Sequence, residues 1–113
     1  MRIINLTGHV VEIRPAEGGT IRLPASDRPL RLLERPERTG TVDLGGCVVD
    51  RFEVSVELPP DLPDPQDDLL YVVPQIVARS LPGREDLVYP YDLIRNEEGR
   101  VTGARALARA VAR

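Results

Sequence analysis

Short hydrophobic runs alternate with turn residues along the chain, and this pattern predicts a protein built mainly from β-strands. No run has the length and the 3.6-residue spacing of a long amphipathic helix. The clearest alternation lies in 48–58, VVDRFEVSVEL: one parity contains Val48, Phe52, Val54, Val56 and Leu58, and the other contains Glu53, Ser55 and Glu57. We expect a strand here with one face in the core and one face in solvent.

The N-terminal half contains further strand-like runs, which we place at 3–6, 10–13, 20–23 and 30–34. Thr7-Gly8-His9 separates the first two runs as a turn or bulge. Glu17-Gly18-Gly19-Thr20 is a turn signal, so 9–14 and 20–24 are expected to pair as a hairpin. The stretch 35–40, RPERTG, is predicted to be a polar loop.

The C-terminal half predicts a strand, a short helix and a hairpin within 69–107. Pro74 suits a helix start and Pro82-Gly83 a helix stop. The helix face expected to be buried contains Ile76, Val77, Ser80 and Leu81. Leu87 to Ile94 is strand-like and interrupted by Pro90, which predicts an edge position or a bend. Asn96-Glu97-Glu98-Gly99 is a hairpin turn signal, and 101–107 is the returning strand.

These elements together predict a mainly β (α+β) fold. We expect a curled, mostly antiparallel sheet, as a sandwich or partial barrel, with one short helix. A chain of 113 residues suggests a single domain, 1–113. Its expected parts are a β part (1–58), a proline-rich acidic connector (59–68), a strand–helix–hairpin part (69–107) and a frayed tail (108–113), although the Ala- and Arg-rich end also suits a helix.

Composition narrows the classes of partner. The net charge is −3, and there is neither a basic footprint for nucleic acid nor a long apolar run for a membrane. All 15 basic residues are arginine, which fits either a coding bias or selection for bidentate anion contacts. Cys47 is the only cysteine, which excludes an internal disulfide and indicates a cytoplasmic protein. We expect it to be a small buried residue.

Motifs for several well-known chemistries are absent from the sequence. There is no glycine-rich phosphate loop, no GxSxG elbow, no paired-cysteine zinc site and no HExxH. We therefore predict no catalytic residue, no metal site and no cofactor. The balance favours a protein that is not an enzyme, without deciding the question.

The candidate ligand-binding residues are polar side chains at the two ends of the chain. Asn5, Thr7 and His9 alternate, so all three can face one side of an extended segment. Arg95 and Arg105 belong to the final hairpin and would supply guanidinium groups for a phosphate or carboxylate. The structural alternative is that Asn5 and Thr7 satisfy nearby backbone groups while His9 lies on the surface. The arginines would then form surface ion pairs.

Two further features of the C-terminal half require an interpretation. Tyr89 and Tyr91 flank Pro90 and could stack on a flat ligand, or they could be half-buried sheet residues. Arg84-Glu85-Asp86 follows the helix stop and reads as a solvated turn.

The opening IINLTGH and the stretch that starts at YVVPQIVARSLPGREDL resemble a family of small bacterial and bacteriophage proteins. Members begin with I-N-L-T-x-H and carry a late D-L-V-R-D-x-x-G-R-V-x-G-x-R hairpin. The matching residues are Asn5, Thr7, His9, Arg79, Arg84, Asp86, Asp92, Arg95, Gly99, Arg100, Gly103 and Arg105, over about half of the chain. Gly8 stands where the family usually has proline, which implies a looser turn. The resemblance implies a fold unit, a candidate surface and a phage association.

Three functional hypotheses follow. The first is a non-enzymatic cytoplasmic binding module for a small anionic, nucleotide-like ligand or for a partner. The second is a structural or assembly subunit that forms homo-oligomers through exposed strand edges such as 87–91. The third is a small hydrolase with His9 as base, which requires a carboxylate such as Asp86 or Asp92 beside it.

Overall fold

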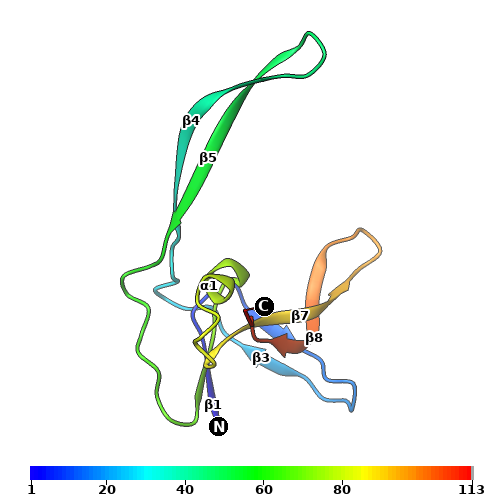
Figure 1. Cartoon of the computed structure of the whole chain (residues 1–113). Helices are drawn as coiled ribbons and strands as arrows, with labels where there is room; N and C mark the ends of the chain where they lie inside the picture. The colour runs from blue at the N-terminus through cyan, green and yellow to red at the C-terminus, as the bar shows by residue number, and fades with distance from the viewer. Residues whose placement is uncertain (113) are drawn as a thin grey trace. The chain divides into compact units, whose positions relative to one another are not determined.

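The computed structural model describes residues 1–112, and Arg113, the last residue of the predicted frayed tail, lies outside this part. The elements in chain order are β1 (Arg2–Asn5), β2 (Val11–Ile13), β3 (Ile21–Leu23), β4 (Leu33–Asp43), β5 (Val48–Glu57), β6 (Leu69–Val72), α1 (Gln75–Ser80), β7 (Leu87–Arg95) and β8 (Val101–Ala108). Figure 1 shows strands throughout the described chain, with a single short helix after β6. The predicted mainly β class is confirmed. No helix in the described chain has the length and apolar character needed to cross a membrane.

The chain divides into two compact units. Unit 1 contains Met1–Leu30 and Asp61–Arg113, and unit 2 contains Arg31–Pro60. This division differs from the predicted one, which kept 1–58 together as one β part of a single domain. The difference arises because β4 and β5 pair only with each other, while the strands on both sides of them join one sheet.

Unit 1 is a six-stranded sheet with the order β1-β6-β7-β8-β2-β3. The pairs β2–β3 and β7–β8 are antiparallel, and the first of these is the predicted hairpin. The pairs β1–β6, β6–β7 and β2–β8 are parallel. The sheet is therefore mixed rather than mostly antiparallel. Parallel pairing needs long crossovers, and one of these contains α1 between β6 and β7.

The sheet of unit 1 curls so that its two edges approach each other. After β3, the chain returns to the end of β1, where Ser26 N donates to Thr7 O at 2.9 Å and Leu30 N donates to Leu6 O at 3.0 Å. These bonds join the β3 end of the sheet to the β1 end. The result is the nearly closed sheet expected of a partial barrel.

The core of unit 1 lies inside the curl and is aliphatic. One cluster of buried residues contains Val11, Ile13, Leu23, Val72 and Val88, with Ile3, Leu70 and Leu107 packed against it. The side chains of Val73, Val77 and Leu87 are also fully buried. The helix α1 packs against β7, and its buried residues are Val77 and Ala78.

The buried face of α1 differs from the predicted face. Ile76 was expected to be buried but is 40% exposed, whereas Ala78 is 2% exposed. With only six residues, the helix takes its orientation from the sheet rather than from its own pattern. Pro90 lies within β7, beyond the last β6–β7 pair at Val72 and Val88, so only β8 pairs with it. This is the predicted edge position.

Unit 2 is a long two-stranded hairpin (Figure 1). The predicted polar loop 35–40 is wrong, because these residues form the middle of β4. The predicted core face of β5 is also wrong, because Phe52 and Val54 are 55% and 54% exposed. No second layer of unit 2 covers the hairpin. Cys47, expected to be buried, is exposed at its tip.

Candidate functional site

A cleft opens in unit 1 where β6 ends and β7 continues. Its volume is about 560 Å³. The walls come from the loop after β1, from β2, from the β6–α1 corner and from the β7–β8 hairpin. The lining residues are Thr7, His9, Val10, Val11, Glu12, Val73, Pro74, Gln75, Tyr89, Pro90, Leu93, Val101, Thr102, Gly103 and Ala104. The opening segment and the last hairpin therefore share one recess, at the mouth of the partial barrel.

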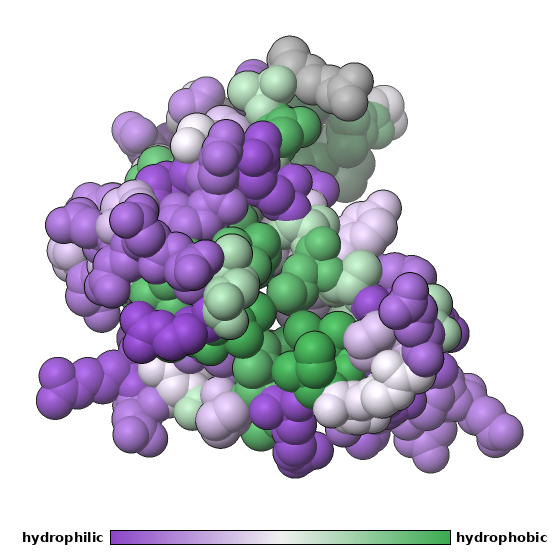
Figure 2. All heavy atoms as spheres, turned by 90° about the horizontal axis from the view of Figure 1, so that it is seen from below, coloured by the Kyte–Doolittle hydropathy of each residue, from purple (hydrophilic) through white to green (hydrophobic). Residues whose placement is uncertain are grey.

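Most of the cleft wall is apolar. Val10, Leu93 and Val101 are 46%, 42% and 50% exposed, which is unusual for aliphatic side chains gathered around one recess. Figure 2 shows a face of the molecule on which hydrophobic residues gather around a hollow, with hydrophilic residues on most of its border. Such a surface suits a ligand with an apolar body.

Asn5 has a structural role beneath the cleft. Its side chain is buried, and Oδ1 accepts from Thr7 N at 2.9 Å and from Thr7 Oγ1 at 2.7 Å. Its Nδ2 donates to His9 O at 2.7 Å and to Pro24 O at 3.1 Å. These four bonds use the hydrogen-bonding capacity of the amide and connect β1, the following turn and the end of β3. Asn5 shapes the turn and has no group left for a ligand.

Thr7 and His9 line the cleft, but their environments differ. The Thr7 hydroxyl donates to Asn5 Oδ1 at 2.7 Å, with His9 O at 3.1 Å as the alternative acceptor, so it is part of the turn. His9 is exposed, and within the described chain no carboxylate lies at ion-pair or hydrogen-bond distance from its imidazole. The imidazole is thus at the edge of the cleft without the acidic partner that a general base requires.

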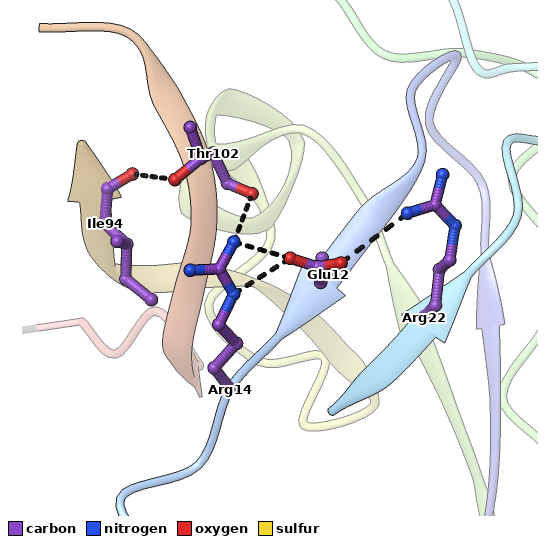
Figure 3. A network of polar contacts seen from close by, with 5 residues as sticks. All are labelled: Glu12, Arg14, Arg22, Ile94 and Thr102. Atoms are coloured by element: carbon purple, nitrogen blue, oxygen red, sulfur yellow. Dashed lines mark hydrogen bonds and ion pairs between the residues drawn. The ribbon is translucent and has the colours of Figure 1, made fainter. Parts of the chain in front are cut away.

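Glu12 is the carboxylate of the cleft, and arginines neutralise it (Figure 3). Its Oε2 accepts from Arg14 Nε at 2.9 Å and Nη2 at 2.7 Å, and its Oε1 lies 3.5 Å from Arg22 Nη1. Arg14 Nη2 also donates to Thr102 O at 3.4 Å. The network connects β2 with both of its neighbours, β3 and β8. It links the strands at the mouth of the barrel. The guanidinium of Arg14 is bound within this network rather than directed at a ligand.

Neither arginine of the predicted site lines the cleft. Arg95 is exposed and donates from Nη1 to Gly99 O at 3.0 Å within its own hairpin turn. Arg105 Nη1 lies 3.9 Å from Asp92 Oδ1, with both side chains about half exposed. The structure therefore brings Thr7 and His9 together with the hairpin, but not with these guanidinium groups.

The sequence interpretation missed the apolar walls of the cleft. Tyr89 lines it, whereas Tyr91 is 57% exposed and outside it. Leu93 and Val101 flank the predicted turn 96–99, and the sequence showed them only as ordinary strand residues. The available signal for the cleft was the aliphatic β7–β8 hairpin, which extends past the end of β6. This signal could be recognised only if the pairing of β6 with β7 was already known.

A second missed feature is the ion pair between Arg84 and Asp86, which we expected to be a solvated turn. Arg84 donates to both carboxylate oxygens at 2.8 Å and to Pro63 O at 2.9 Å. The side chains are 21% and 11% exposed. The hydrogen bonds from Arg84 lower the pKa of Asp86 in spite of its burial, and those bonds raise the pKa of Arg84. Through the bond to Pro63 O, the pair ties the segment 61–68 to the turn before β7 within unit 1.

Among residues 1–112, no group of three or more His, Cys, Asp or Glu side chains is placed to hold a metal ion. No protein-family model, no curated protein and no solved structure matches this chain.

Proposed function

We propose that this protein is a non-enzymatic, cytoplasmic binding module whose cleft accepts an apolar side chain from a segment of a partner protein. The observation that carries the proposal is the set of exposed aliphatic residues around the cleft: Val10, Leu93 and Val101. Burying them against a partner would contribute about 25 cal/mol for each Å² of apolar surface removed from water. The single, exposed thiol of Cys47 supports the cytoplasmic assignment.

The rim of the cleft supports a peptide rather than a small apolar molecule. The polar residues of the lining include Thr7, His9, Gln75 and Thr102, which bring hydroxyl, imidazole and amide groups beside the apolar ones. Clefts that take one anchoring side chain of a partner combine such a rim with an apolar centre. The cleft, at about 560 Å³, has room for one aromatic or branched aliphatic side chain and the backbone beside it.

We favour a partner protein over a small anion as the ligand of the cleft. An anion site needs cationic or N–H donors aimed into the recess. Arg95 and Arg105 lie outside the lining, and Arg14 is already bound to Glu12. The hydrolase hypothesis receives no support, because His9 lacks a carboxylate partner among the described residues.

Selection from a peptide library displayed on phage tests the proposal. The full-length protein is the bait, and Leu93→Glu is used for counter-selection, because it puts a charge on the cleft wall. We expect enriched peptides to share an aromatic or aliphatic anchor. Their affinity, measured by fluorescence polarisation, should fall at least 10-fold in Leu93→Glu. Leu44→Glu is the matched control, since Leu44 is 65% exposed in the β4–β5 turn, and it should leave the affinity within about twofold.

Failure of the selection, or equal binding by Leu93→Glu, contradicts the proposal. A thermal-shift experiment with ADP and inorganic phosphate then examines the anionic version. At 100 times its dissociation constant, a ligand stabilises by about 2.7 kcal/mol, so a real anion site gives a clear shift. If Arg95→Ala and Arg105→Ala abolish that shift, the ligand of this protein is a small anion rather than a partner protein.

A homo-oligomeric assembly subunit is the second candidate. The originally expected edge, 87–91, is only partly available, because β7 pairs with β6 at Leu87 and Val88. The observation that favours this candidate lies instead in unit 2, where apolar side chains are exposed on both faces of the hairpin, Phe52 and Val54 on one and Val42 and Val49 on the other.

A further inference from the structure

A second hollow lies beside the cleft of unit 1 and has a volume of about 550 Å³. It is formed by the end of α1, the turn after it, β7 and the chain after β8. The lining residues are Arg79, Pro82, Tyr89, Arg109, Ala110, Val111 and Ala112. The charged side chains of this lining, within the described chain, are Arg79 and Arg109, and we call the feature the arginine hollow. It presents positive charge next to an apolar recess.

The cleft and the arginine hollow adjoin along α1. Tyr89 belongs to the linings of both. Gln75, the first residue of α1, lines the cleft, and Arg79, about one turn later, lines the arginine hollow. With the amide oxygen of Gln75 turned toward it, Arg79 donates to this oxygen from Nη2 at 2.8 Å and from Nε at 3.1 Å. A segment that leaves the cleft along α1 would therefore enter the arginine hollow.

The guanidinium groups of the arginine hollow are available to an anion. Arg79 is exposed, and among residues 1–112 it forms no ion pair with a carboxylate. Arg109 Nη1 lies 3.4 Å from Glu85 Oε1, with side chains that are 42% and 79% exposed. An ion pair with this exposure contributes little, so a carboxylate of a ligand can replace Glu85. Guanidinium groups suit this role, because they bind carboxylates through two parallel hydrogen bonds.

We propose that the partner segment carries an acidic side chain, Asp or Glu, two or three residues from its apolar anchor. This inference rests on the proposed function and specifies the chemistry of the partner. The anchor occupies the cleft, and the acidic side chain binds Arg79 and Arg109. Gln75 and Arg79 are separated by about 6 Å along the helix axis. An extended peptide advances about 3.3 Å per residue, so two or three residues span this distance.

Selection from a peptide library displayed on phage tests the inference. The anchor position of the library is restricted to Leu, Ile, Phe and Trp, and its flanks are random. The wild-type protein should enrich Asp and Glu two or three positions from the anchor. Arg79→Glu should lose this preference, because it places a negative charge where the acidic side chain binds. The peptides are fused to the coat protein at their C-terminus, so a side chain must supply the carboxylate.

Fluorescence polarisation measures the contribution of the carboxylate. In the enriched peptide, replacement of the acidic residue by its amide should weaken binding to the wild type about fivefold. The same replacement should change binding to Arg79→Gln by less than about twofold, because the partner of the carboxylate is gone. Equal binding of the amide peptide by both proteins would show that the cleft is intact in Arg79→Gln.

Arg28→Gln is the matched control for Arg79→Gln. Arg28 is exposed in unit 1 and belongs to neither lining, so this variant removes the same charge elsewhere. It should distinguish the acidic peptide from its amide as strongly as the wild type does. An equal loss of discrimination in Arg28→Gln and Arg79→Gln would mean that overall charge attracts the peptide, and it would overturn the inference.

The outcomes separate this inference from the proposed function. Enrichment of apolar anchors without acidic flanks overturns the acidic partner and leaves the proposed role of the cleft standing. The same conclusion follows if the amide peptide loses as much affinity for Arg79→Gln as for the wild type. Failure to enrich any peptide that Leu93→Glu rejects overturns both.

Discussion

Unit 1 and the β4–β5 hairpin are built from similar strand residues but bury them very differently. Val72 in β6 and Val54 in β5 are both strand valines, yet they are 0% and 54% exposed. The two residues differ in what faces them. Val72 packs inside a curled sheet closed by chain returning to β1, whereas Val54 has only the paired strand beside it.

This difference shows that alternation indicates a strand but not a core. A period of two places side chains on two faces, and burial then depends on a second layer. Unit 1 obtains that layer by curling its sheet, so its apolar face turns inward. The hairpin has only two strands and cannot curl into a layer of its own, so within unit 2 apolar side chains such as Phe52 and Val54 remain exposed.

The largest predicted effect compares truncations in the two units. Leu87 is fully buried, so Leu87→Ala should lower the free energy of unfolding by about 2–5 kcal/mol through lost burial and a cavity. Leu44→Ala at the exposed hairpin turn should change it by less than about 0.5 kcal/mol. Urea denaturation followed by circular dichroism measures both. Equal costs would mean that the hairpin residue is as well packed as the core.

The next prediction compares two asparagines. Asn5 makes four hydrogen bonds beneath the cleft, and Asn5→Ala leaves buried partners unsatisfied, at a cost of about 2–3 kcal/mol. Asn96 also accepts two backbone bonds, from Glu98 N and Arg100 N, but in an exposed turn. Water replaces those bonds, so Asn96→Ala should cost about 1 kcal/mol. Urea denaturation measures the loss of stability in both variants. A larger loss in Asn96→Ala than in Asn5→Ala would contradict the assigned role of Asn5.

Much of the local structure could be predicted from the sequence, for identifiable reasons. The β2–β3 and β7–β8 hairpins have glycine-containing turns between alternating strands, and both form as expected. The structural alternative for Asn5 and Thr7 was also available from local chemistry, because short polar side chains bond to neighbouring backbone groups.

The rest depended on partners far apart in the chain. The polar composition of 35–40 predicted a loop, but these residues form part of β4. A strand of an exposed two-stranded ribbon needs no apolar alternation, so its sequence resembles that of a loop. The cleft depends on the parallel β6–β7 pair ending at Val72 and Val88, which no local pattern predicts. Arg95 and Arg105 were placed correctly on the final hairpin, but the direction of their side chains depends on the curl of the whole sheet.

The smallest predicted effect compares two ion pairs of similar length. Arg84–Asp86 is formed at 2.8 Å between side chains that are 21% and 11% exposed, and Arg38–Asp50 at 3.0 Å between side chains 55% and 57% exposed. Asp86→Asn should cost about 1–3 kcal/mol at pH 7, since it weakens a half-buried pair. Asp50→Asn should cost less than about 1 kcal/mol, because water screens the exposed pair.

The pH dependence identifies the source of this cost. Folding lowers the pKa of Asp86, because Arg84 donates to its carboxylate. The stabilisation is therefore fully present above the pKa of the unfolded state, about 3.9, and is lost as the pH falls through the lower pKa of the folded state. Urea denaturation from pH 7 to pH 2 should show a steeper loss of stability for the wild type than for Asp86→Asn, with the two curves converging in acid. Parallel curves would mean that packing, rather than the charge of Asp86, holds residues 61–68 in place.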